Sequence, residues 1–216
     1  MTALIFDMDG VIVDSTPMHR ESWVAFNRRY GLETTEAMHE SMYGKRNDEI
    51  VRNFFGDQLS DAEVYERGRA KEQLYREMIA GRAQSMLVPG LRDFLERHRD
   101  LPLAVGSNAE PENIALVLDQ TGLRRYFRVI VDGHQVNRPK PYPDVYLRAA
   151  ELLGVEPAKC IVFEDSYSGV AAGVAAGMPV IGVRTTYVNL PGTALTVDNF
   201  YSGDLDSWLL SQMQSV

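Results

Sequence analysis

The chain has a single cysteine, Cys160, among its 216 residues. One thiol cannot form a disulfide within the chain, which excludes a disulfide-stabilised secreted domain and suits a reducing compartment. Because a free, unreactive cysteine packs as a small apolar side chain, we expect Cys160 to lie in the core.

Positive charge is also scarce. The chain has 22 Lys and Arg against 30 Asp and Glu, so its net charge is −8 at pH 7. Such a chain repels polyanions, and we therefore expect no nucleic-acid partner and no anionic membrane as a partner. A small anionic substrate is compatible with this charge, because a metal ion and a few local cations reverse the field within one pocket.

Long hydrophobic runs are missing as well. No stretch approaches the roughly 20 apolar residues of a membrane span, and the N-terminus lacks the basic and apolar regions of a signal peptide. We find no internal repeat and no low-complexity tract. With 45% hydrophobic and 24% charged residues, the composition is that of an ordinary globular protein. We expect a cytoplasmic protein, a monomer or a weak dimer.

Five short apolar segments predict buried strands. They are Ala3–Phe6, Leu101–Val105, Arg128–Val131, Cys160–Phe163 and Pro179–Val183. Segments with helical spacing lie between the later ones, and residues 144–153 are an example that ends at Gly154. Strands that alternate with helices predict an α/β fold with a doubly wound, Rossmann-like parallel sheet.

Residues 16–82 interrupt this alternation, because they contain no convincing strand. Three helical segments are expected there, at 19–30, 48–55 and 61–80. The first has Trp23, Phe26 and Tyr30 on one face, which we expect to be core. We therefore predict a helical cap of residues 16–82 inserted into a core of residues 1–15 and 83–216. Its hinges are expected near Ser15–Pro17 and Gly81–Pro89.

The first predicted strand ends in acidic residues. Asp7 and Asp9 follow it directly, with Gly10 and then Asp14 after them. Packed carboxylates at the end of a buried strand repel one another and lose hydration, unless a hard cation lies among their oxygens. Open α/β sheets bind ligands beyond the carboxyl ends of their strands. The pattern therefore indicates a metal-dependent site at this place.

Three further segments carry groups suited to a phosphate. Ser107 and Asn108 follow the second strand, Lys140 precedes a later helix, and Glu164 and Asp165 follow the fourth strand. Any one of these patterns is common, but four in this order, each at a predicted strand or helix end, are specific.

With Asp7-Met-Asp9-Gly10, these segments resemble the four motifs of the haloacid dehalogenase superfamily. The resemblance covers nearly the whole chain. The phrase DMDGVIVDS, followed by a helical insert, is similar to the subgroup of β-phosphoglucomutase and its related phosphatases, which have a helical cap.

The resemblance implies a mechanism for phosphoryl transfer. Asp7 is the expected nucleophile, which forms an aspartyl-phosphate, and Asp9 is the expected general acid and base. Ser107 and Lys140 are expected to hold the transferring phosphoryl group, with Asn108 beside them as a substrate-binding residue.

The resemblance also implies Mg²⁺ as the cofactor. Asp7, the backbone carbonyl of Asp9, and Asp165 are the expected protein ligands. Glu164 is either a further ligand or a residue that orients the ligands.

The expected substrate is a small phosphorylated metabolite, and the preferred function is a phosphatase of compounds such as sugar phosphates. β-Phosphoglucomutase is the alternative, because His19 and Trp23 match its His-x-x-x-Trp pattern. A binding protein on the same scaffold is a third reading, but no motif carboxylate is missing. A phosphonate-cleaving enzyme is a fourth reading, and it would need a Schiff-base lysine from the cap, for which Lys45 is the candidate.

Two departures in the predicted cap oppose the mutase. Its cap arginine stands one position early here, in Gly44-Lys45-Arg46-Asn47, and its cap lysine is replaced by Arg76 or lost. His19, Lys45, Arg46 and Arg76 remain candidate substrate-binding residues, with exposed cap surface as the structural alternative for the three basic ones.

The motif residues have structural alternatives too. Asp7 and Asp9 are compatible with a turn or a helix cap, Ser107 and Asn108 with helix N-capping, and Lys140 with an exposed surface.

Among their neighbours, we expect Asp144 to be a helix N-cap and Ser15 to donate a hydrogen bond to Asp9. Glu164 and Asp165 are also compatible with capping the helix that follows them.

Overall fold

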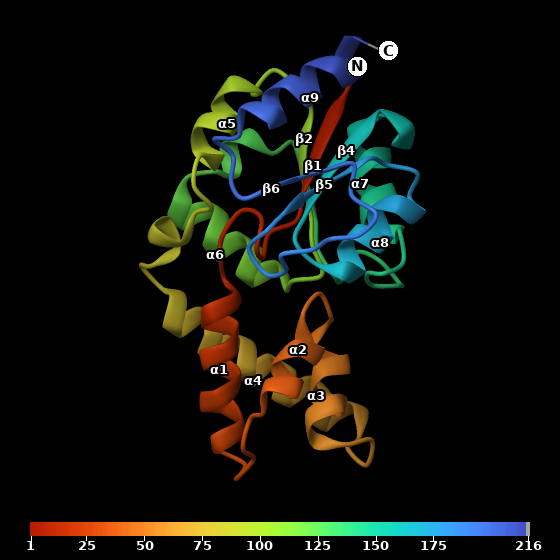
Figure 1. The fold of residues 1–216 in the computed structure, drawn as a ribbon. Helices are drawn as coiled ribbons and strands as arrows, with labels where there is room; N and C mark the ends of the chain where they lie inside the picture. Colours follow the sequence, from red (N-terminus) through yellow and green to blue (C-terminus); the bar gives the residue numbers. More distant parts are fainter. Residues whose placement is uncertain (215–216) are drawn as a thin grey trace.

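The computed structural model describes residues 1–214 and has a six-stranded sheet at its centre (Figure 1). All pairings between neighbouring strands are parallel, and the strand order is β3-β2-β1-β4-β5-β6. The strands are β1 (Ala3–Phe6), β2 (Leu103–Gly106), β3 (Val129–Val131), β4 (Cys160–Glu164), β5 (Val180–Val183) and β6 (Leu195–Val197). The five predicted strands are confirmed to within two residues at their ends.

The edge strand β6 was not predicted. It pairs only with β5, and two of its three residues are partly exposed. A segment this short carries no readable alternation, so its pairing with β5 defines it.

Helices cover both faces of the sheet, which confirms the doubly wound fold (Figure 1). The core helices are α5 (Leu91–Arg97), α6 (Pro111–Thr121), α7 (Asp144–Leu153), α8 (Tyr167–Ala175) and α9 (Gly203–Gln214), with short 3₁₀ turns at Ala83–Met86, Arg124–Tyr126 and Pro157–Lys159.

Successive side chains of each strand point to opposite faces, and each face has its own core. On one face Phe6 stacks on Phe163 at 4.6 Å, beneath α5, α6 and α9. On the other, Ile5 and Val162 pack with α7 and α8, and Cys160 is buried there as predicted.

The segment between β1 and the return to the core is helical, as predicted. It contains α1 (Thr16–Arg28), α2 (Glu36–Met42), α3 (Asn47–Phe55) and α4 (Asp61–Ile79). These helices surround a separate apolar cluster that includes Trp23, Phe26 and Phe54. Tyr30 departs from the prediction, since it lies beyond the end of α1 and is 48% exposed. The short, largely polar α2 was missed.

The cap lies beyond the carboxyl ends of the strands (Figure 1). The chain enters and leaves it side by side, because Val13 forms an antiparallel bridge with Leu87, and the Asp14 amide donates to the Met86 carbonyl at 2.8 Å. We keep residues 16–82 as the cap and the flanking residues as the core as a working division. Over residues 1–214, no helix combines the length and apolarity that crossing a bilayer requires.

Candidate active site

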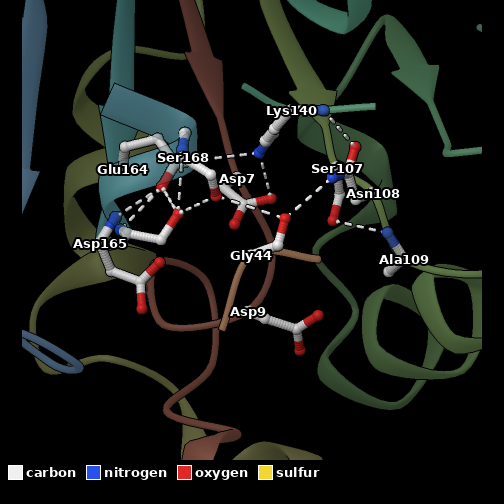
Figure 2. A network of polar contacts seen from close by, with 12 residues as sticks. Asp7, Asp9, Gly44, Ser107, Asn108, Ala109, Lys140, Glu164, Asp165 and Ser168 are labelled. Atoms are coloured by element: carbon white, nitrogen blue, oxygen red, sulfur yellow. Dashed lines mark hydrogen bonds and ion pairs between the residues drawn. The ribbon is translucent and has the colours of Figure 1, made fainter. Parts of the chain in front are cut away.

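Three segments of the core place Asp7, Lys140 and Glu164 together (Figure 2). Asp7 follows β1, Glu164 is the last residue of β4, and Lys140 lies in the loop before α7. The Lys140 Nζ lies 2.9 Å from Asp7 Oδ1 and 2.6 Å from Glu164 Oε1, and all three side chains are buried. Burial lowers the pKa of Lys140, but Asp7 and Glu164 outweigh it and hold that pKa above its ordinary range. Lys140 is therefore a buried ammonium, and the exposed-surface alternative is wrong.

The Glu164 carboxylate accepts hydrogen bonds on both of its oxygens. It accepts hydrogen bonds from Lys140 Nζ, from the Tyr146 hydroxyl at 2.7 Å, and from the backbone amides of Asp165 and Ser166 at 2.9 and 3.0 Å. The Ser166 hydroxyl adds another at 3.0 Å. Since a carboxylate has about four lone-pair sites, Glu164 fits the role of orienting Lys140 better than that of a metal ligand.

Carboxylate oxygens of Asp7, Glu164 and Asp165 lie within 4.8 Å of one another. Burial raises the pKa of Asp7 to about 7, with Glu164 and Asp9 adding to the rise and Lys140 opposing it. Burial, Glu164 and Asp7 raise the pKa of Asp165 well above its usual range. Asp7 Oδ1 is buried without a hydrogen bond, although Lys140 lies at ion-pair distance. Carboxylates crowded in this way, with Lys140 as the ammonium beside them, fit a hard divalent cation.

Gly10 makes room for Asp165. A Cβ at Gly10 would fall 1.9 Å from Asp165 Oδ2, and its backbone has φ +76°, which favours glycine. The Thr186 hydroxyl donates to the same Oδ2. The glycine after Asp9 is therefore needed for the approach of the β4 carboxylate to the end of β1.

The Asp9 side chain faces the hinge. Its Oδ1 accepts from the Ser15 hydroxyl at 2.6 Å, as predicted, and lies 3.3 Å from His19 Nε2. Burial raises the pKa of Asp9, but His19 and Ser15 outweigh it and keep that pKa below its usual value. Figure 2 shows this carboxyl apart from the Asp7–Lys140–Glu164 group. The proposed metal contact of its backbone carbonyl stays a prediction.

Ser107 and Asn108 follow β2, and neither caps α6, whose N-cap is Glu110. The buried Ser107 hydroxyl accepts from the Ala109 amide at 3.2 Å and lines the cavity next to Asp7. The Asn108 amide donates to the Gly44 carbonyl of the cap at 3.0 Å and accepts from the Lys140 amide at 3.2 Å (Figure 2). The side-chain nitrogen of Asn108 thus fixes the cap segment at Gly44, and its side-chain oxygen fixes the loop at Lys140.

The N-cap expected at Asp144 is wrong. Pro143 occupies that position without a side-chain cap, and Asp144 is the first helical residue. Its carboxylate instead pairs with the Arg138 guanidinium at 2.7 and 3.0 Å. Glu164 and Asp165 do not cap α8 either, because the Ser166 side chain accepts from the Gly169 amide.

The candidate cap residues separate into two groups. His19 and Lys45 line a cavity of about 100 Å³ that also includes Asp7, Asp9 and Lys140. Arg46 and Arg76 instead line a wider opening between α3, α4 and α6. Arg76 donates to the side-chain oxygen of Asn113 at 2.9 Å, so it does not replace a lysine at the substrate.

Lys71 is a residue that the sequence interpretation missed. Its side chain is 1% exposed, and its ammonium lies 2.9 Å from His19 Nδ1 and pairs with Glu72 at 2.7 Å. A signal was present, since the buried positions of α4 are spaced as one helical face and two of them are charged: Val64, Gly68, Lys71, Glu72, Tyr75 and Ile79. Charged residues at positions spaced like the buried face of a helix indicate a paired or functional polar group in the interior.

Comparison with known proteins identifies the family. The family model described as haloacid dehalogenase-like hydrolase matches residues 1–177. The fructose-1-phosphate phosphatase YqaB of Escherichia coli K12 is 34% identical over 182 residues, which cover 84% of this chain and 95% of that protein. The β-phosphoglucomutase of Bacillus subtilis 168 is 30% identical over 188 residues, covering 85% and 83%.

A solved structure agrees. The β-phosphoglucomutase of Clostridium difficile superposes with a TM-score of 0.89 at 25% identity, covering 100% of this chain and 98% of that one. The chain is therefore an enzyme of the haloacid dehalogenase-like hydrolase family, in the subgroup of β-phosphoglucomutase and related phosphatases with a helical cap.

Proposed function

We propose that this enzyme is a Mg²⁺-dependent phosphatase of small phosphorylated metabolites, such as sugar phosphates, and that it acts through an aspartyl-phosphate on Asp7. The observation that carries the proposal is the buried group of Asp7, Lys140 and Asp165 beneath the cap. Buried carboxylates that Lys140 compensates only in part cost stability, and a bound cation would offset that cost.

The first half-reaction transfers the phosphoryl group to Asp7. A carboxylate oxygen of Asp7 attacks phosphorus, the ester P–O bond breaks, and the leaving oxygen takes a proton from the protonated form of Asp9. Lys140 and the Ser107 hydroxyl stabilise the charge on the transferring oxygens.

The second half-reaction is hydrolysis. Asp9, now a carboxylate, removes a proton from water, the water oxygen attacks phosphorus, and the bond to Asp7 breaks to release inorganic phosphate. The hydrogen bonds from Ser15 and His19 favour this ionised form of Asp9.

Asp7 and Asp165, with the Asp9 carbonyl, would hold Mg²⁺, while Glu164 keeps Lys140 in place. When bound, the ion supplies the positive charge that lets an anionic carboxylate approach an anionic phosphate.

The cap side of the cavity supports a phosphatase over a mutase. A phosphoglucomutase must hold a bisphosphate intermediate, so it needs free cations at both ends of the substrate. Here Lys45 lines the cavity on the cap side, but Lys71 is paired with Glu72, a second carboxylate, Glu110, lines the same cavity, and Arg46 lies outside it. His19 and the similarity to β-phosphoglucomutases favour the mutase as the second candidate.

A screen of phosphorylated metabolites with Mg²⁺ tests the proposal. It includes fructose 1-phosphate, 4-nitrophenyl phosphate, and β-glucose 1-phosphate with a trace of its 1,6-bisphosphate. We expect phosphate release, and none from the Asp7→Asn variant. Glucose 6-phosphate without net phosphate release would establish the mutase instead. No turnover of any compound would favour the binding protein.

A further inference from the structure

A second cluster of buried polar groups lies at the seam between cap and core. Glu72 of α4 is 3% exposed, and Asn113 of α6 is 2% exposed. The Asn113 side-chain nitrogen donates to Glu72 Oε2 at 2.5 Å. Its side-chain oxygen accepts from Arg76, one turn after Glu72, at 2.9 Å. A carboxylate only accepts and a guanidinium only donates, so these two cap residues also fix the orientation of the amide.

The other oxygen of Glu72 continues the chain of contacts into the cap. Glu72 Oε1 accepts from Lys71 Nζ at 2.7 Å, and Lys71 Nζ lies 2.9 Å from His19 Nδ1. Because an ammonium only donates, Nδ1 of a neutral His19 is the acceptor and its proton lies on Nε2, the atom facing Asp9.

Aromatic rings pack against His19 and Lys71, the middle residues of this series of contacts. The His19 ring stacks on Tyr75 at 3.9 Å with an interplanar angle of 7°. The Lys71 ammonium lies 5.0 Å from the Trp23 ring centre and 5.2 Å from that of Tyr75. With this support, a shift of Lys71 displaces the imidazole beside Asp9.

We propose that Asn113 is a positioning residue: seated against Glu72, it holds Lys71 and His19 so that Asp9 is aligned for proton transfer only when the cap rests on the core. The inference rests on the proposed phosphatase function. It assigns a role to the seam where α4 of the cap contacts α6 of the core. There the side chain of a core helix responds to the position of the cap.

The physical reason is the cost of an unpaired buried group. When the cap moves away from the core, the hydrogen bond from Asn113 to Glu72 breaks and water takes its place. The Glu72 carboxylate that pairs with Lys71 is then hydrated and no longer fixed in position. A proton donor displaced by a fraction of an ångström loses much of its contribution to the rate.

The test compares substrates with poor and good leaving groups. Loss of proton donation slows the departure of a sugar hydroxyl but barely affects 4-nitrophenolate, and kcat/KM reports this first step. For Asn113→Leu we expect kcat/KM to fall by about 10- to 100-fold with the best sugar phosphate and to stay within about threefold with 4-nitrophenyl phosphate.

A double variant that exchanges the carboxylate and the amide between positions 72 and 113 distinguishes a lost contact from a folding defect. Asn113→Asp alone places a second carboxylate against Glu72 and should lower sugar-phosphate turnover further. In the double variant Glu72→Gln with Asn113→Asp, the amide introduced on α4 donates to the carboxylate introduced on α6 and accepts from Lys71. That new carboxylate accepts from Arg76, and the net charge of the group is preserved. We expect kcat/KM to return to within about threefold of the parent.

Gln120→Ala is the matched control. Gln120 also lies on α6 and accepts from the Gly81 amide at 3.1 Å beside the second hinge, outside the cavity. We expect this variant to have unchanged kinetics with both substrates.

Amide hydrogen exchange tests the inference independently of catalytic activity. Asn113→Leu should speed exchange along residues 64–76 of α4, and Gln120→Ala should not. An equal loss for both substrates, an absent rescue, or unaltered exchange would overturn the inference. If the parent hydrolyses neither substrate, the phosphatase proposal fails, and the exchange result alone decides whether Asn113 fastens the cap.

Discussion

At the residue scale, the site consists of carboxylates that differ in their partners. Glu164 accepts hydrogen bonds from five donors, whereas Asp7 Oδ1 is buried beside the Lys140 ammonium and Asp9 faces the hinge. These surroundings differ as the proposed division among attack, proton transfer and orientation of Lys140 requires.

Asp9→Asn tests this division. Attack on 4-nitrophenyl phosphate needs no proton donor, so the first turnover should proceed, while hydrolysis of phospho-Asp7 slows by about 10²- to 10⁴-fold without a general base. Rapid-mixing absorbance should record a burst of nitrophenolate equal to the enzyme concentration, followed by a slow phase. Steady turnover at the parental rate would refute the role of Asp9.

At the element scale, the cap loop between α2 and α3 is hydrogen-bonded to the core through the backbone of Gly44. The Gly44 carbonyl accepts from Asn108, in the loop after β2, at 3.0 Å and from Ser168, in the first turn of α8, at 3.3 Å (Figure 2). A Cβ at Gly44 would fall 2.0 Å from the Ser168 hydroxyl. The approach of cap to core thus depends on one residue without a side chain.

Gly44→Ala should hold the cap loop off the core and lower kcat/KM by about 10- to 100-fold, measured by steady-state kinetics. Gly31→Ala is the matched control: its φ of +69° resembles the +71° of Gly44, but within residues 1–214 no atom lies within 4 Å of the added Cβ. Both variants carry a backbone strain of about 1–2 kcal/mol. Equal kinetics for the two would contradict a role for close packing at Gly44.

The cap helix α4 should also make stability depend on pH. Burial raises the pKa of Glu72, but Lys71, His19 and Asn113 outweigh it and hold that pKa below its ordinary 4.5. A lowered pKa means that the ionised carboxylate stabilises the fold above pH 4.5 and that this contribution is lost as the pH falls through the folded pKa.

Glu72→Gln, which leaves Lys71 without its counter-charge, should therefore lower the free energy of unfolding by about 3 kcal/mol at pH 7. Urea unfolding of parent and variant at pH 7 and pH 4 should give a smaller difference at pH 4. An equal or larger difference at pH 4 would show that the carboxylate charge contributes nothing.

At the scale of the whole molecule, the site lies between two bodies, each with its own apolar cluster, joined by the paired segments at Val13 and Leu87. Its acidic residues come from the ends of β1 and β4, which are central neighbours in the sheet. A ligand that relieves their repulsion should stabilise the core.

Saturating Mg²⁺ should accordingly raise the melting temperature by about 5–10 °C, the effect of an ion at 100 times its Kd on a protein of this size. Asp165→Asn should lose most of this shift, and the control Asp144→Asn, whose partner is the exposed Arg138, should keep it. Differential scanning calorimetry with Mg²⁺ and with EDTA provides the measurement. A full shift in Asp165→Asn would remove that residue from the metal site.

Much of the core fold could be predicted from the sequence. The strands β1, β2, β4 and β5 are buried along their whole length and read as continuous apolar runs. The missed elements, β6 and α2, are short, and their conformations depend on neighbours rather than on their own patterns.

The sequence by itself determined where Asp7, Ser107 and Asp165 lie, because each directly follows a strand, and the carboxyl ends of parallel strands meet at one edge of the sheet. Only the tertiary structure decided that Glu164 pairs with Lys140 and that Lys71, rather than Arg76, reaches His19. These roles depend on donors and acceptors from distant segments, and a hydrogen bond needs a distance and a direction that spacing along one helix does not specify.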